Sequence, residues 1–156
     1  MIPVNLIETL TAHLRKLLAD YSTEQPSGTF IVDVIPGRIP NPETAQENIS
    51  AVYVIVRSVE DAGGNEMSSA TVEMILSIYD EDDLTGWRTL YNVAEHIRQY
   101  LLKHRILDKK YMLKINTENP VRTVFVDDQP YPQWIATITA KYTISQPEEE
   151  GILYGR

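Results

Sequence analysis

The sequence predicts an α+β domain in which a mainly antiparallel sheet carries two helices on one face. Three observations lead to this fold. Apolar and polar residues alternate over residues 70–80, which is the pattern of a strand with one buried face. From Trp87 the apolar spacing changes to three and four residues, which indicates an amphipathic helix. Hairpin signals separate the strands and no repeated βαβ unit occurs, so the strands should pair mainly with antiparallel neighbours.

The N-terminal part of the chain predicts one helix and one short strand. Leucines at helical spacing indicate a helix over residues 3–20, and Pro3 suits its first turn. Residues 30–34 alternate and predict a strand that Pro36 and Gly37 end. The polar, proline-rich residues 36–50 are more than a simple connection. Because loops of this length in compact domains are usually either functional or disordered, we expect an ordered contact loop there rather than a flexible one.

Two long strands joined by a hairpin form the predicted centre of the sheet. Residues 51–59 are rich in β-branched side chains, which favours a strand. Gly63 and Gly64 supply the positive φ angles that a turn into residues 70–80 requires. After this strand we expect Asp82 or Asp83 to cap the long helix. The apolar positions of that helix are Trp87, Leu90, Ala94, Ile97 and Leu101.

The C-terminal third predicts a short strand at residues 111–115 and a long final strand at residues 134–144. Residues 121–126 fit either a further short strand or an extended loop. The acidic segment from residue 147 is expected to be flexible, because a charge run without apolar partners does not offset the entropy of ordering. Since domains commonly span roughly 100–200 residues, we expect one domain over residues 1–146 and a tail over residues 147–156.

The composition narrows the class of function. The 156-residue chain is 43% hydrophobic, has no cysteine and carries a formal net charge of −8. The lack of cysteine excludes disulfides, thiolate catalysis and cysteine-based zinc sites. The negative charge disfavours general binding to DNA or to anionic membranes. Without a signal peptide or a run of ~20 apolar residues, we expect a protein of the cytoplasm in which it is made, with no membrane partner.

The densest group of acidic side chains is Asp80, Glu81, Asp82 and Asp83. One interpretation is a divalent metal site built from carboxylate oxygens. The interpretation that we prefer is helix capping, because the run follows a strand, precedes a helix and lacks the spacing of a calcium-binding loop. We therefore predict no metal.

No other motif predicts catalysis. Ser68 and Ser69 do not occur in a nucleophile elbow, and no His-Glu-x-x-His pattern is present. The remaining polar and aromatic candidates are expected to have structural roles. The histidines should lie on the helix surfaces or at the edge of the core, and most of the aromatic rings should pack in the core rather than on a nucleic acid. These residues are His13, His96, His104, Tyr91, Tyr100, Tyr111, Trp134 and Tyr142. The sequence thus predicts no enzyme, no catalytic residue and no cofactor.

The order of these elements resembles that of a known family. A leading helix, a hairpin whose second strand ends in Ser77-Ile-Tyr-Asp80, and a long helix carrying Ala94-Glu-His-Ile-Arg-Gln-Tyr-Leu-Leu102 come first. A final strand introduced by Tyr131-Pro-Gln-Trp134 completes the pattern. This arrangement, over roughly residues 3–144 of an α+β domain, is similar to the tail-terminator, tail-completion and minor tail proteins of long-tailed bacteriophages and prophages.

The resemblance implies a structural virion protein without enzyme activity. Such a protein forms a homo-oligomeric ring of six subunits, caps the tail tube, ends tail polymerisation and joins the tail to head-neck proteins. Its partners are copies of itself, the major tail tube protein and a head-neck completion protein. DNA would pass through the bore without sequence-specific recognition. The implied location is the host bacterial cytoplasm during assembly and then the head–tail junction of the virion.

A head-to-tail ring requires two different complementary surfaces on each subunit. We expect them in three projecting segments, with contacts at Arg38, Ile39, Pro40, Asn41, Pro42, Gly63, Gly64, Asn65, Arg122, Asp127 and Asp128. Two alternatives stay open. One is another neck or tail-tube component, such as a head–tail connector. The other is a small metal-dependent enzyme with Asp80, Asp82 and Asp83 as ligands.

Overall fold

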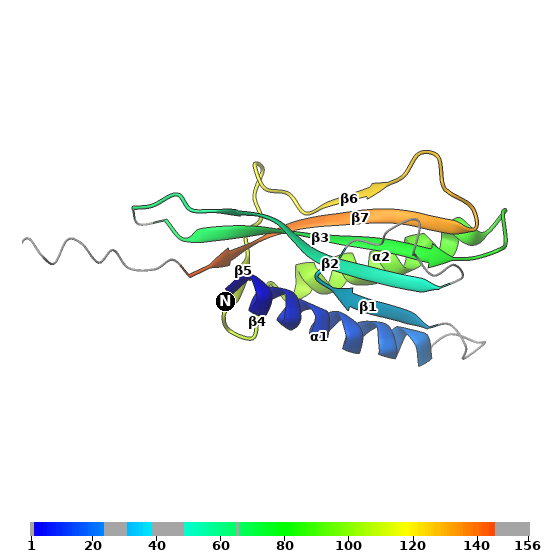
Figure 1. The fold of residues 1–156 in the computed structure, drawn as a ribbon, viewed down its shortest axis with the longest axis horizontal. Coiled ribbons are helices and arrows are strands. Elements are labelled where there is room, and N and C mark those ends of the chain that lie inside the picture. Colours follow the sequence, from blue (N-terminus) through cyan, green and yellow to red (C-terminus); the bar gives the residue numbers. More distant parts are fainter. Residues whose placement is uncertain (1, 24–30, 39–48, 65, 146–156) are drawn as a thin grey trace, which may run out of the picture.

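The computed structural model describes residues 2–23, 31–38, 49–64 and 66–145, which form an α+β fold (Figure 1). The helices are α1 (Ile2–Thr23) and α2 (Gly86–Lys103). The strands are β1 (Val32–Pro36), β2 (Ser50–Glu60), β3 (Ser68–Tyr79), β4 (Ile106–Leu107), β5 (Tyr111–Leu113), β6 (Arg122–Phe125) and β7 (Gln133–Ile144). Both helices lie on one side of the sheet, α1 against β1 and β2, and α2 against β3 and β7 (Figure 1). The predicted fold class is confirmed.

The sheet is mainly antiparallel, as predicted. Its order is β1-β2-β3-β7-β5-β4, and β6 pairs with β7 farther along the edge that β5 also uses. The exception is the β1–β2 pair, which is parallel. Residues 37–49 separate these two strands, and a parallel pair requires a connection of about a dozen residues or more.

The core lies between the helices and one face of the sheet. On β3 and β7 alternate residues are buried throughout, from Ala70 to Ile78 and from Trp134 to Ile144, so the period-two pattern predicted for both strands is confirmed. The other face, here called the outer face, carries the half-buried intervening residues of these strands. At β2 both faces are buried from Ser50 to Ile55. No helix among the described residues is long and apolar enough to cross a membrane.

The first turn of α2 differs from the prediction. Trp87 was expected on the buried face, but its side chain is 43% exposed. Gly86 occupies the buried position instead, and a Cβ atom there would lie 2.5 Å from Cε2 and Nε1 of Trp134. The Trp134 ring from β7 thus fills the space beneath the first turn. Tyr91 lies one turn farther along the same side of the helix as Trp87 and is 46% exposed.

The acidic residues before α2 do not cap the helix in the way that the sequence predicted. The helix begins after Thr85, whose side chain makes no capping hydrogen bond. The Asp82 carboxylate accepts hydrogen bonds from the amides of Leu84 and Thr85 at 3.0 and 3.1 Å. It therefore caps the turn that leads into α2 rather than the helix itself, and Asp83 does neither. The Thr85 side chain and these two amides hold the pKa of Asp82 below its usual value.

The short elements near the sheet edges agree only in part with the prediction. Helix α1 is confirmed and extends to Thr23, whereas β1 begins and ends about two residues later than expected. Residues 121–126 contain a strand, β6, and the two-residue strand β4 was not predicted. Most of the predicted contact loop, residues 39–48, and the predicted tail lie outside the described residues.

Candidate interaction surface

The predicted contact residues lie at two ends of the sheet. Gly63 and Gly64 form the tip of the β2–β3 hairpin with φ angles of 78° and 64°. Arg122 lies on β6, and Asp127 and Asp128 lie in the turn after it; all three side chains are exposed. Figure 1 shows the hairpin and the β6–β7 turn at opposite ends, so these segments form two separate surfaces.

The other predicted contact residues follow β1 or belong to the hairpin tip. Arg38 is exposed just after β1. Five of the predicted contact residues lie outside the described residues: Ile39, Pro40, Asn41, Pro42 and Asn65.

An apolar surface that the sequence did not predict lies where α2 begins, beside β6. We call it the α2–β6 patch and define it as Leu84, Trp87, Tyr91 and Phe125. Tyr91 stacks on Phe125 with ring centroids 4.1 Å apart, and Trp87 meets Tyr91 edge-on at 5.5 Å. The Trp87 indole N–H donates to the carbonyl of Leu84, which is 82% exposed. Exposed apolar groups held in place in this way are typical of protein interaction sites.

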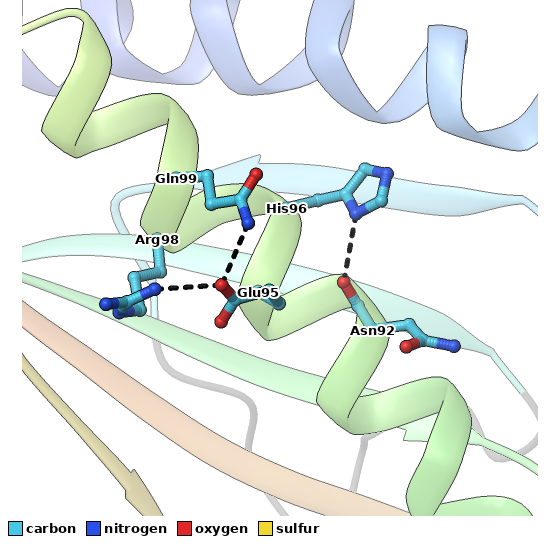
Figure 2. Close-up of polar contacts among 5 residues, drawn as sticks. All are labelled: Asn92, Glu95, His96, Arg98 and Gln99. Carbon is cyan, nitrogen blue, oxygen red and sulfur yellow. Dashed lines mark hydrogen bonds and ion pairs between the residues drawn. The ribbon is translucent and has the colours of Figure 1, made fainter.

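Farther along α2 than the patch, the helix carries polar side chains (Figure 2). One Glu95 oxygen accepts hydrogen bonds from Arg98 Nη1 at 2.8 Å and from Gln99 Nε2 at 3.0 Å. One turn earlier, His96 Nδ1 lies 3.2 Å from the carbonyl oxygen of Asn92. The exposed side chains of these later turns, such as Glu95, Arg98 and Gln99, are polar, so the apolar surface is confined to the first turns.

The edge of β1 is protected against pairing with another strand. Arg15 of α1 donates from Nε and Nη2 to the Val34 carbonyl oxygen at 3.3 and 3.0 Å. Two positions later, Pro36 has no N–H group to offer. A helix cover and a proline are usual ways of protecting a sheet edge.

The edge of β6 is open. In an antiparallel ladder, hydrogen-bonded and non-hydrogen-bonded residue pairs alternate. The Val126 amide donates to Ile135 at 3.2 Å, so Val124 and Arg122 also face β7 with their backbone groups. The N–H and C=O groups of Thr123 and Phe125 therefore point away from β7. Among the described residues these four groups have no hydrogen-bond partner.

The enzyme interpretation requires Asp80, Asp82 and Asp83 as metal ligands. In the structure, Asp80 and Asp82 instead accept hydrogen bonds from neighbouring groups of the protein. One Asp80 oxygen accepts from the Asp82 amide at 2.9 Å and the other from the Thr89 hydroxyl at 3.2 Å. Asp82 binds the two amides described above. Within the described parts of the chain, no group of three or more His, Asp or Glu side chains is arranged to hold a metal ion.

A polar cluster joins α1, α2 and the turn after β4. His13 Nε2 lies 2.9 Å from an Asp108 oxygen, and His13 Nδ1 lies 2.5 Å from the Tyr100 hydroxyl. Since a carboxylate only accepts, Nε2 donates, and in the neutral imidazole Nδ1 accepts from Tyr100. Burial, with a smaller effect of the Asp108 charge, raises the pKa of Tyr100. The hydrogen bond between the Tyr100 hydroxyl and His13 links the two helices. Asp108 and Lys109 hold positive φ angles of 50° and 60°.

Two buried tyrosines near this cluster differ in how their hydroxyls are satisfied. Tyr111 is 5% exposed and donates to Asn5 Oδ1 at 2.5 Å. Tyr142 is fully buried, and its hydroxyl has no partner among the described residues. Burial raises the pKa of Tyr142. Both side chains are core components, as the sequence predicted.

Comparisons with known proteins leave the family open. No family model and no curated protein matches the chain. One similar solved structure, of a protein designated by a sequence identifier, aligns over 91% of this chain and 97% of that chain. Its TM-score is 0.46 and its sequence is 14% identical. A likeness of this size carries no argument about function.

Proposed function

We propose that this protein is a structural component of a long-tailed bacteriophage or prophage particle. In this proposal it acts as a tail terminator: a ring of six copies caps the tail tube, ends tail polymerisation and joins the tail to head-neck proteins. The ring assembles in the host bacterial cytoplasm and remains at the head–tail junction of the virion, with DNA passing through its bore. The resemblance in the order of elements supports this proposal.

The observation that carries the proposal is the exposed α2–β6 patch beside an open sheet edge. Together they offer apolar side chains and unpaired backbone groups to a second protein chain. The opposite edge of the sheet, at β1, is protected. A subunit with such unlike sides suits a head-to-tail contact, which closes into a ring when the rotation between neighbours permits.

The β2–β3 hairpin supplies a separate surface for a different partner. Its tip lies at the other end of the sheet from the patch (Figure 1). Ser68 donates a hydrogen bond to the Asp61 carboxylate at the base of the tip, which ties the two sides of the loop together. In the proposal this hairpin contacts the tail tube protein, whereas the patch contacts a neighbouring subunit.

The test measures assembly and tube capping with the full-length protein. Light scattering and negative-stain microscopy should reveal a ring with the mass of six subunits. Adding it to the tail tube protein of the same phage during polymerisation should give shorter tubes with a ring at one end. The proposal would be overturned if the protein is monomeric at every concentration and does not change the length of the tubes. Open-ended tubes formed by this protein alone would assign it to the tail tube instead.

A matched pair of variants on α2 tests the role of the patch. Tyr91→Lys places a charge within the stacked aromatic side chains and should abolish ring formation while the subunit remains folded. Gln99→Lys adds the same side chain on the polar part of the same helix (Figure 2) and should leave the ring intact. Equal assembly of the two variants would show that the patch is not the contact.

A further inference from the structure

We propose that residues 150–156 of one subunit add to the open edge of β6 in the neighbouring subunit as a parallel strand. This inference rests on the assembly into a ring proposed above, and it names the segment that joins the subunits. The acceptor is described in the structure. The donor segment lies outside the described residues, and its sequence is given in full.

The acceptor strand requires a partner with free backbone groups. Adding a strand to a sheet edge satisfies backbone N–H and C=O groups with main-chain hydrogen bonds, while alternate side chains provide specificity. Thr123 and Phe125 each offer one outward N–H and one outward C=O group. A parallel partner would accept from both N–H groups and donate to both C=O groups. Four hydrogen bonds would thus form across the interface.

The donor segment has the composition of a short edge strand between charged ends. Its sequence is Glu150-Gly-Ile-Leu-Tyr-Gly-Arg156, in which three adjacent apolar residues follow an acidic run and precede a basic residue. Isoleucine and tyrosine favour strands. The three apolar residues have glutamates on their N-terminal side and an arginine on their C-terminal side. Charges on the acceptor strand can therefore favour one strand orientation over the other.

One register matches both the charges and the side chains. When Ile152 lies beside Val124, Glu150 lies beside Arg122 and Arg156 falls near Asp128. Val124 is 51% exposed on the outer face, so Ile152 would cover an exposed apolar side chain.

In the same register the next residue meets the α2–β6 patch. Leu153 lies beside Phe125, whose ring points to the helix side of the sheet and stacks on Tyr91. Leu153 would therefore extend the apolar cluster that the patch begins. The antiparallel orientation would place Arg156 beside Arg122 and the glutamates beside Asp128, so repulsion disfavours it.

The geometry favours donation between subunits. Within one chain, Glu150 would have to reach the level of Thr139, the β7 partner of Arg122. Ser145 lies six residues beyond that level, about 20 Å along β7, and the added strand lies two strand spacings away, about 10 Å. The required span is roughly 22 Å. The five residues from Ser145 to Glu150 extend at most about 18 Å, so the segment must come from a second copy.

Exchange of this kind makes each subunit both a donor and an acceptor. The two surfaces involved are different, as a heterologous contact requires, and the contact can be repeated around a closed ring. The strand exchange thus gives a physical basis for a directional ring.

Single-cysteine variants test the exchange directly, since the chain has no cysteine of its own. Full-length Val124→Cys and Ile152→Cys proteins are mixed and oxidised under mild conditions, and the linked peptides are identified by mass spectrometry. Because each chain has one thiol, any disulfide between positions 124 and 152 joins two subunits. The matched control replaces Val124→Cys with Ile106→Cys, an apolar residue on β4 that is 58% exposed.

The expected result is an excess of the 124–152 disulfide over the 106–152 disulfide of about tenfold or more, because adjacent strands raise the effective concentration of the two thiols. Leu153→Asp should abolish both the ring and the cross-link between Val124→Cys and Ile152→Cys chains. Intact rings in Leu153→Asp without the 124–152 excess would overturn the exchange and leave the proposed function standing. The 124–152 disulfide in a protein that neither forms rings nor caps tubes would support the exchange and overturn the proposed function.

Discussion

The substitution Gly86→Ala tests how closely α2 approaches the sheet. At an exposed helical position, alanine would stabilise the helix relative to glycine by up to about 1 kcal/mol. Here the new Cβ atom would lie 2.5 Å from Cε2 and Nε1 of Trp134 and 2.8 Å from Cζ2. The ring has little freedom to move, because Trp134 is 8% exposed and its indole N–H donates to the Asp80 carbonyl at 3.0 Å.

The expected net effect is a loss of stability. Overpacking in a core costs about 1–3 kcal/mol, and loss of the indole hydrogen bond adds about 1 kcal/mol. After subtraction of the helix-propensity gain, Gly86→Ala should lower the free energy of unfolding by about 1–3 kcal/mol. In a Trp134→Phe background the smaller ring leaves space for the Cβ atom. The same substitution should there be neutral or stabilising, so the two sites should show a coupling energy of at least about 1 kcal/mol.

The assay is urea unfolding of the four proteins in this cycle, followed by far-UV circular dichroism. The free energy of unfolding should fall with urea concentration at the same slope in all four proteins, so that differences in the urea midpoint report differences in stability. A stabilising effect of Gly86→Ala in the parent protein, or an equal effect in both backgrounds, would refute the packing argument.

The remaining predictions concern hydroxyls, backbone strain and charge; the first two use the same urea unfolding measurement, and the third uses thermal unfolding. Tyr142→Phe should leave the free energy of unfolding unchanged or raise it by about 1 kcal/mol, because it removes a buried hydroxyl without a described partner, whereas Tyr111→Phe should lower it by about 1 kcal/mol. Lys109→Gly should raise it by about 0.5–1 kcal/mol by relieving a positive φ, and Lys110→Gly, which has no such φ, should lower it. Because the fold lowers the pKa of Asp82, its carboxylate stabilises the protein above the unfolded pKa and this contribution is lost as the pH falls. Asp82→Ala should therefore lower the melting temperature at pH 7, and the difference should shrink below about pH 4; a difference that does not change with pH would contradict the charge argument.

The elements that the sequence predicted correctly depend on short-range periodicity. The alternation of β3 and β7 and the leucine stripe of α1 need only the pitch of one element and one apolar environment. The β2–β3 hairpin follows from two glycines with positive φ between two strand patterns. The sequence predicted helix α2, but not which residue precedes its first turn or which large side chain there faces the core.

The candidate site was predicted only in part. Arg122, Asp127 and Asp128 were singled out and are exposed on and after β6, beside the open edge. The α2–β6 patch was missed, although Trp87 and Tyr91 lie four residues apart and so share one side of a helix. That spacing was the available signal. It does not tell an inward side from an outward side.

By itself, the sequence determined the fold class, the two helices, the central hairpin and the buried face of the long strands, because each of these follows from local periodicity and turn chemistry. Only the tertiary structure decided which groups meet across the chain. Trp134 packs against Gly86, His13 meets Asp108 across 95 positions, and among the described strands β6 pairs on one side only. Such outcomes depend on distances between elements far apart in the chain, and periodicity within one element contains no information about them.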